Sequence, residues 1–246
     1  MRASHPTSDT PAPPLAARPV GEIVAEDYGR AAVLRRHGIG FCCGGGTPLA
    51  EACTRKGIPL ATVEAEIAAH DARMASLGEE APLPDSATDP ALLVDHLEAV
   101  HHAWVRENLP PLLHFTGRVA KVHGDGWPWL REVAERTRHF AETLTVQMDQ
   151  EETELFPAIR RARAGLAEYA PALGTLSGLE EGHEVARSLL SELRELTTDF
   201  TPPPQACATW RAAYAKLMEF ELDLDRHFHL ENNLLFPALR ARAAAS

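Results

Sequence analysis

Two stretches of the chain carry acidic and imidazole side chains in the same pattern. When Glu231 in HFHLENNLLFPALRARA is placed on Glu151 in QMDQEETELFPAIRRARA, the Phe-Pro-Ala segments and an arginine also coincide. His227 in the later copy then falls on Gln147 in the earlier one. Residues four apart lie on one face of a helix, so each copy points a carboxylate and its partner in one direction. Burying such groups in an apolar core is costly unless they are paired or bound to a cation.

Two further histidines belong with these pairs. His183 lies on an apolar stripe of leucine and alanine at spacings of three and four residues, and His102 lies on the first predicted helix of the same region. Together with the glutamates, they place ligand-type residues on four predicted helices. Imidazole with carboxylate suits iron, manganese or zinc, and two glutamates able to bridge suit a pair of metals better than one. A purely structural polar core is the alternative.

Four long helical patterns position these residues. They run at 90–116, 127–163, 174–198 and 205–243, separated by the segments KVHGDG, EYAPALG and DFTPPP. No stretch alternates apolar and polar residues as a strand would. Four helices with short connections predict an all-α, up-down-up-down bundle, in which metal sites are built from inward-facing side chains.

Composition divides the chain into four parts. We expect a disordered tail at 1–19, a small helical unit at 20–78, a linker at 79–90 and the bundle at 91–246. Within the small unit, Thr47 is expected to cap a helix that has Pro48 at its first position and stops at Gly57.

The turn HGIGFCCGGG before that helix contains the adjacent Cys42 and Cys43. Amides at a helix N-terminus favour thiolate over thiol, so the pair is a candidate for metal binding, disulfide exchange or reaction with nitric oxide. The alternative is a tight turn with one buried and one incidental cysteine. Cys53 and Cys207 are expected to be structural. These four cysteines do not suggest a disulfide framework, which fits a reducing compartment.

The overall composition argues against several functions. The 246 residues carry a net charge of −11, which repels phosphate backbones and anionic lipid, so neither nucleic acid nor a membrane is expected as a partner. No apolar run approaches the roughly 20 residues of a membrane span, and the first residues lack the apolar middle of a secretory signal. We therefore expect a cytoplasmic protein.

Five stretches together resemble a known family. They are FCCGGG, VDHLEAVHHAWVRENLPPL, EEGHE, TPPPQACATW and HFHLENNLLFP. The arrangement is similar to the hemerythrin-like di-iron bundles. More closely, it resembles the iron-sulfur cluster repair proteins of the RIC or ScdA/NorA type, in which a domain with a Cys-Cys-Gly-Gly turn precedes the bundle. The resemblance extends from Val20 to Arg240.

The resemblance implies a set of iron ligands. It assigns the metal to His102, Glu151, His183, His227 and Glu231. Gln147 stands where the family has a histidine, and three interpretations are open. It is a weak ligand at one corner of a di-iron site, or it only hydrogen-bonds a metal-bound water, or the second metal is lost. Two irons per chain are expected, or one if the second site is lost.

Other histidines receive lesser roles. His123 in KVHGDG matches a histidine that the family has near its site, so a supporting or access role is weighed against a solvated loop histidine. Four more lack a partner at ligand spacing and are expected at the surface or rim: His70, His96, His114 and His229.

The resemblance also implies a function. It predicts a protein of the nitrosative and oxidative stress response that binds nitric oxide and supports the repair of damaged iron-sulfur proteins. Cys42 and Cys43 would pass iron or electrons to the client. Reduction of nitric oxide at the iron site is left open, as is a homodimer. The alternative is a nitric oxide or oxygen buffer of hemerythrin type, without turnover.

Overall fold

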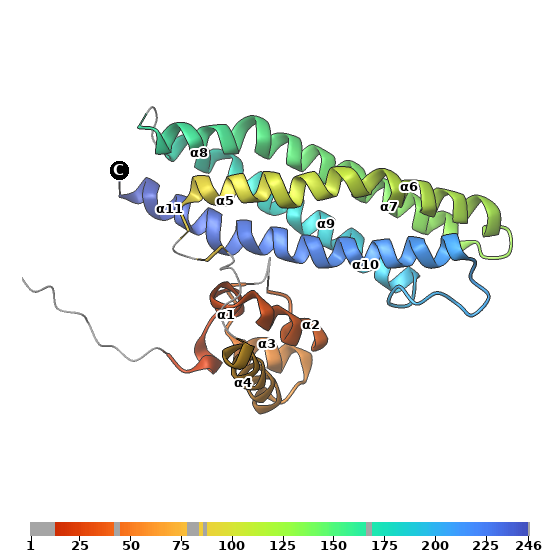
Figure 1. Cartoon of the computed structure of the whole chain (residues 1–246), viewed down its shortest axis with the longest axis horizontal. Helices are drawn as coiled ribbons and strands as arrows, with labels where there is room; N and C mark the ends of the chain where they lie inside the picture. Colours follow the sequence, from red (N-terminus) through yellow and green to blue (C-terminus); the bar gives the residue numbers. More distant parts are fainter. Residues whose placement is uncertain (1–12, 42–44, 78–83, 86–87, 166–168, 246) are drawn as a thin grey trace, which may run out of the picture. The chain divides into compact units, whose positions relative to one another are not determined.

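The computed structural model describes residues 13–41, 45–77, 84–85, 88–165 and 169–245. The chain divides into two compact units, Met1–Pro82 and Leu83–Ser246. Regular structure in the described residues is helical (Figure 1), apart from one isolated bridge between Pro19 and Pro48. The predicted all-α class is confirmed.

Short helices form the first unit. They are α1 Val20–Glu26, α2 Ala31–Arg36, α3 Leu49–Lys56 and α4 Leu60–Leu77, with 3-10 turns at Leu15–Ala17 and Tyr28–Arg30. Their apolar faces meet in a small core that includes Ile23, Leu34, Leu49, Val63 and Ile67. Cys42 and Cys43 lie outside the described residues, and Cys53 is buried in this unit.

Two details of this unit differ from the predictions. Pro48, not Thr47, occupies the cap position of α3, because its backbone is extended (φ −59°, ψ 142°) and the Thr47 carbonyl accepts a hydrogen bond from the Val20 amide at 2.9 Å. The structured chain also begins before residue 20. Arg18 donates to Glu26 at 2.5 and 3.0 Å, so the predicted tail at 1–19 is too long.

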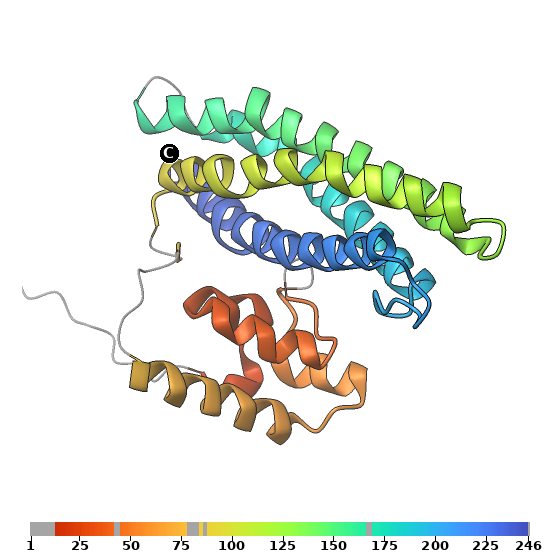
Figure 2. The same cartoon turned by 45° about the vertical axis from the view of Figure 1, so that its right-hand side comes forward.

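Four long helices form the described part of the second unit, in up-down-up-down order (Figures 1 and 2). The first comprises α5 Pro90–His96, a π-helical turn Leu97–His102 and α6 Ala103–His123. The second comprises α7 Trp129–Gln150, a π-helical turn Glu151–Leu155 and α8 Phe156–Arg163. The third is α9 Leu176–Leu196. The fourth comprises α10 Ala208–His229, a π-helical turn Leu230–Leu235 and α11 Phe236–Ala244.

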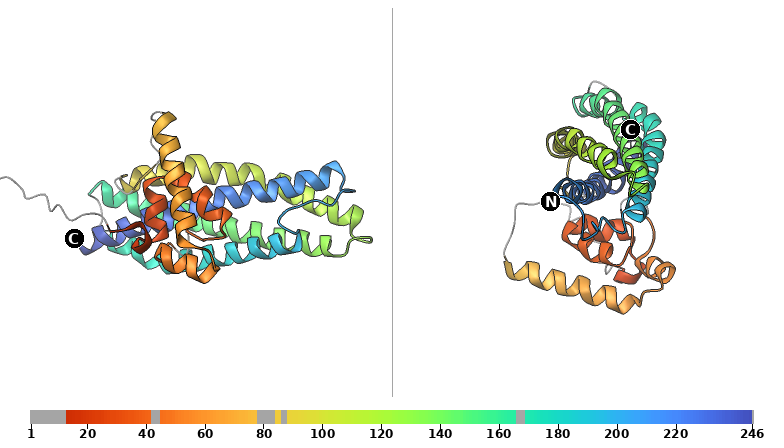
Figure 3. Two further views of the ribbon diagram at one scale, coloured as in Figure 1. Left: turned by 90° about the horizontal axis from the view of Figure 1, so that it is seen from below. Right: turned by 90° about the vertical axis from the view of Figure 1, so that its right-hand side faces the viewer.

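Neighbouring long helices pack along their lengths. Helix α6 contacts α7 and α10, and α7 contacts α9, as Figure 3 also shows. The first long helix continues to His123, past the predicted end at 116, because the residues KVH carry it on to the glycines of GDG. No helix in the described part of the chain is long and apolar enough to cross a bilayer.

Two of the π-helical turns have a visible cause in the sequence. Pro157 and Pro237 each lie two residues after the end of such a turn and lack a backbone N–H. A proline ring also clashes with the carbonyl four residues earlier, here Thr153 and Asn233, and both carbonyls lie within the π-helical turns. Widening the turn relieves that clash. Single π-helical turns inside α-helices frequently mark functional sites.

Candidate metal centre

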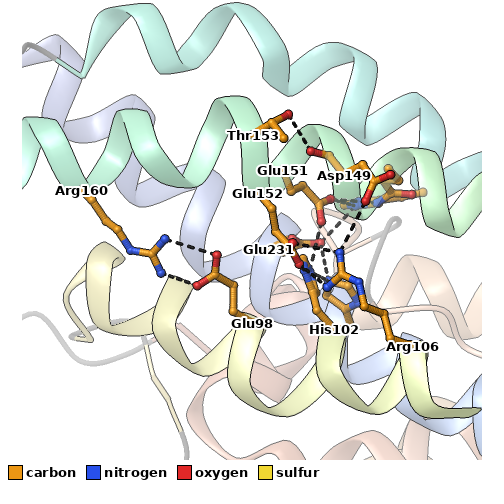
Figure 4. Close-up of polar contacts among 12 residues, drawn as sticks. Glu98, His102, Arg106, Asp149, Glu151, Glu152, Thr153, Arg160 and Glu231 are labelled. Atoms are coloured by element: carbon orange, nitrogen blue, oxygen red, sulfur yellow. Dashed lines mark hydrogen bonds and ion pairs between the residues drawn. The ribbon is translucent and has the colours of Figure 1, made fainter.

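Two glutamates form the middle of a buried polar cluster. Glu151 lies in the π-helical turn of the second long helix and Glu231 in that of the fourth, and both side chains are 0% exposed. Figure 4 shows the two carboxylates reaching inward from different helices toward His102 of the first. The repeated segment of the sequence therefore supplies two facing walls of one site.

One side of the carboxylates, here called the two-histidine side, carries His102 and His227. His102 Nε2 lies 3.2 Å from Glu151 Oε2 and 3.3 Å from His227 Nε2. His227 Nε2 lies 3.3 Å from Glu231 Oε2. Ligand atoms of these four residues all fall within 4.8 Å of one another. Atoms bound to one ion at about 2.0–2.2 Å have comparable separations, so this side is sized for one metal.

The other side, here called the one-histidine side, carries His183 and Gln147. His183 Nε2 lies 3.1 Å from Glu231 Oε2 and 3.8 Å from Glu151 Oε1. The Gln147 amide nitrogen donates to Glu151 Oε1 at 3.1 Å. Glu151 therefore presents one oxygen to each side, which is how a bridging carboxylate is placed.

Several buried atoms of this cluster lack a hydrogen-bond partner within the described chain. They are Gln147 Oε1, Glu151 Oε2, His183 Nε2 and both carboxylate oxygens of Glu231. Orphaned polar atoms at this depth cost free energy unless something satisfies them. A cation bound among them would do so, and imidazole with carboxylate suits iron, manganese or zinc. The residues present thus fit a metal centre.

The charges in the cluster support one another. Burial opposes the charge on His183, but the Glu151 and Glu231 carboxylates outweigh burial and raise the pKa of His183 to about 10. Burial also opposes the charge on Glu231, yet the imidazoles of His227 and His183 hold the pKa of Glu231 well below its ordinary value. Protons thus stabilise the metal-free cluster, so metal binding displaces protons.

Hydrogen bonds orient two of the imidazoles toward the metal centre. His102 Nδ1 pairs with Glu152 Oε1 at 2.6 Å, and Arg106 holds the same carboxylate at 2.6 and 2.8 Å (Figure 4). His183 Nδ1 pairs with Asn232 Oδ1 at 2.9 Å. Such partners fix the ring so that Nε2 faces the metal. The sequence interpretation missed Glu152, Asn232 and Arg106; the first two directly follow the ligand glutamates, which is the signal that was available.

Two family domains match the chain. The ScdA_N domain, a domain of unknown function (DUF542), matches residues 16–71, and the hemerythrin HHE cation binding domain matches residues 93–239. Proteins named iron-sulfur cluster repair protein YtfE from Citrobacter koseri, Escherichia coli O157:H7 and Cronobacter sakazakii are each 34% identical over 221 residues. That alignment covers 89% of this chain and 95% of each relative. The chain belongs to the family of iron-sulfur cluster repair proteins.

Membership in the iron-sulfur cluster repair family confirms the resemblance inferred from the five sequence stretches. The predicted metal residues all lie within the match to the hemerythrin domain: His102, Gln147, Glu151, His183, His227 and Glu231. A hemerythrin cation-binding domain implies iron, and the buried cluster is where this domain would hold it.

Other histidines of the hemerythrin-like domain are more buried than predicted. His229 is 1% exposed, not at the surface, because its helix face turns into the bundle, and burial lowers its pKa to about 4. His101, for which no exposure was predicted, is also buried; it packs against His227 with ring centroids 5.5 Å apart and pairs with Asp223 at 2.9 Å. In the first unit, His70 is buried as well and pairs with Asp27 at 2.9 Å. His114 is exposed, as predicted, and His96 is half-buried.

His123 does not support the metal centre. It lies at the end of α6, about 30 Å along the helix from His102 at 1.5 Å per residue. Its Nε2 is 3.3 Å from Cys207 Sγ, and its ring lies against Trp210. Cys207 is an exposed free cysteine at the cap position of α10, so the expectation of a structural role there stays a prediction. The family motif had suggested proximity that the length of α6 excludes.

Proposed function

We propose that this protein holds two iron ions in its bundle and uses them to support the restoration of damaged iron-sulfur clusters. One observation carries the proposal: Glu151 and Glu231 are fully buried between imidazoles on both sides, with oxygens that lack hydrogen-bond partners in the described chain. The names of the 34% identical relatives support the repair role. Ferrous iron in such a site supplies a coordination position for a small molecule such as nitric oxide.

The two sides of the metal centre differ in the ligands that they offer to iron. His102, His227 and the two glutamates would hold the first ion, and with two imidazoles this is the stronger side. His183 would hold the second ion together with the carboxylates of Glu151 and Glu231. Gln147 uses its amide nitrogen to fix Glu151, so its role is to position the bridging carboxylate at a corner where no imidazole binds. Iron on the one-histidine side is therefore the more weakly held.

The metal content of anaerobically isolated protein tests the first part of the proposal. We expect close to two irons per chain when ferrous iron is in excess. The second ion should leave first when the free metal concentration is lowered. A chain that takes up no iron, or whose stability does not change when His183 is replaced by alanine at any iron level, would contradict the proposal.

Binding of nitric oxide needs a separate test. Reduced, iron-loaded protein titrated with nitric oxide without oxygen should give an iron-nitrosyl signal in electron paramagnetic resonance. Absence of that signal would exclude nitric oxide as a ligand. Multiple turnovers to nitrous oxide would make the protein an enzyme, whereas stoichiometric uptake and release would favour the alternative function, a nitric oxide or oxygen buffer.

A further inference from the structure

A pocket of about 400 Å³ opens between α7 and α9, which pack side by side in the bundle. Its walls include His139, Glu142 and Gln150 of α7 and two glycines of α9, Gly178 and Gly182. The glycines are four apart and leave one strip of α9 without side chains. A Cβ added at Gly178 would meet nothing within 4 Å, so the space beside it is open.

The floor of this pocket is Gln147, the residue that stands in place of a ligand histidine. A Cβ added at Gly182 would lie 3.3 Å from Gln147 Oε1, so the amide oxygen is directed at the glycine strip. Gln147 is 5% exposed, and Oε1 has no hydrogen-bond partner within the described chain. Its amide nitrogen holds Glu151 at 3.1 Å. A single amide group therefore separates the pocket from the bridging carboxylate.

The residues that line the pocket favour a cation as its ligand. The pocket walls contain the Glu142 carboxylate, the His139 imidazole and the side-chain amides of Gln147 and Gln150, with no lysine or arginine among the described lining residues. Such groups accept hydrogen bonds from the water shell of a metal ion or bind the ion directly. The Glu142 carboxylate puts one negative charge on the wall, and negative charge in a cleft raises the local concentration of cations.

We propose that this pocket is the port through which a hydrated divalent cation reaches and leaves the one-histidine side of the metal centre, with Gln147 as the inner gate. This inference rests on the proposed function and deepens it. Replacement of a firmly binding imidazole by an amide leaves the ion at the floor of the pocket weakly held. The same glycine strip then gives it a path out between α7 and α9. Iron on the one-histidine side is the exchangeable iron, and iron on the two-histidine side stays.

Blocking the port without touching the ligands tests the proposal. Gly178→Leu fills the pocket from a position whose added Cβ meets nothing, so the bundle should accept it. Gly117→Leu is the matched control, because Gly117 is also helical, has open space at its Cβ and is not among the lining residues. Glu142→Gln removes the charge from the wall. Its control is Glu135→Gln, an exposed glutamate on α7 outside the pocket lining.

The measurement is the rate at which ferrozine removes ferrous iron from the full-length protein without oxygen, together with the rate of reloading by ferrous iron alone. We expect Gly178→Leu to slow the fast phase of both processes about tenfold, equivalent to about 1.4 kcal/mol in the barrier. Glu142→Gln should slow loading and weaken its dependence on ionic strength. Both controls should match the parent protein, and the iron content at saturation should be unchanged in all variants.

Two results would contradict the proposal that this pocket is the port for iron. One is equal iron exchange rates in Gly178→Leu, Gly117→Leu and the parent protein. The other is that Gly178→Leu slows the association of nitric oxide while iron exchange continues at the parent rate. The pocket would then be a route for nitric oxide and not for the metal ion. Failure of the proposed function looks different, because the parent protein would then take up no iron at all.

Discussion

At the scale of single residues, Gln147 sets how strongly the one-histidine side can hold an ion, because it stands where the later copy of the repeat has His227. The Gln147 side chain is buried and already engaged with Glu151, so a histidine there would point an imidazole into the one-histidine side. The local geometry therefore makes the identity of this residue a control on the affinity of the second ion.

Gln147→His should tighten binding of the second iron. Because the variant supplies the missing imidazole, we expect an increase in affinity of about 10–100-fold, the range associated with changes around metal ligands. Competition with a ferrous chelator measures it. Gln150→His is the control, since it adds an imidazole to the pocket wall without facing the carboxylates. If the parent chain already retains two irons with equal affinity, Gln147 is itself an adequate ligand.

The pH dependence of unfolding of the metal-free protein follows from two histidines with opposite shifts. Burial lowers the pKa of His229 to about 4 from 6.5, so the unfolded chain binds more protons between these values and stability falls as the pH drops through them. That loss approaches about 3 kcal/mol. The raised pKa of His183 acts in the other direction: its stabilisation is complete below 6.5 and is lost as the pH rises toward 10. Stability should therefore peak near neutral pH.

Urea unfolding of metal-free protein at a series of pH values measures this profile. His229→Gln should reduce the loss of stability at acid pH and leave the loss at alkaline pH unchanged. His183→Gln should remove the loss at alkaline pH that comes from the raised pKa of His183. If the free energy of unfolding of His229→Gln falls with decreasing pH as steeply as that of the parent protein, other buried groups such as His101 cause the fall.

The sequence predicted which side chains meet in the buried cluster better than it predicted the groups around them. Spacing of four residues and the repeat located Glu151, Glu231 and His227, because helical periodicity is local information. The roles of Glu152 and Asn232 in orienting His102 and His183 were missed, because they depend on which helix lies opposite each residue. His123 was expected near the metal centre because of its motif, but the motif does not give its distance from His102 along the helix.

At the scale of elements, the helices could be predicted from periodicity, but their π-helical turns could not. All three π-helical turns described occur in the long helices that carry the glutamates or His102, and each contains one of those residues. A proline after Phe156 and Phe236 explains two of them. The turn at Leu97–His102 has no proline in the following turn, so proline does not account for it.

Removing one residue from a π-helical turn should disconnect the metal centre. Deletion of Glu154, which is exposed, would restore α-helical spacing and rotate Glu151 by about 100° relative to α8. We expect helicity close to that of the parent by circular dichroism, with loss of at least one iron per chain. Glu154→Ala keeps the chain length and should load iron normally. Full iron content in the deletion variant would mean that the turn does not position Glu151.

At the scale of the whole molecule, the duplicated segments also tie the bundle together outside the metal centre. Arg160 of the earlier copy bonds Glu98 of the first long helix (Figure 4) and also Asp95 of that helix. Arg240 of the later copy bonds Glu180 of α9 at 2.7 Å. Each copy thus contributes a buried carboxylate and, about two turns later, a cross-helix ion pair. The metal centre is complete within the second unit, since its predicted ligands all come from that unit.

Metal binding and cluster repair should therefore separate between the two units. A chain beginning at Leu83 should take up as much iron as the full protein, because every residue of the cluster is retained. It should fail to restore a damaged iron-sulfur enzyme, since Cys42 and Cys43 are the candidate thiols for passing iron or electrons to a client. The full-length Cys42→Ser, Cys43→Ser variant should behave in the same way, with normal iron content and lost restoration, whereas Cys53→Ser should retain both. Restoration by the shortened chain at the parent rate would place the whole repair function in the bundle and leave the vicinal cysteines without a part in it.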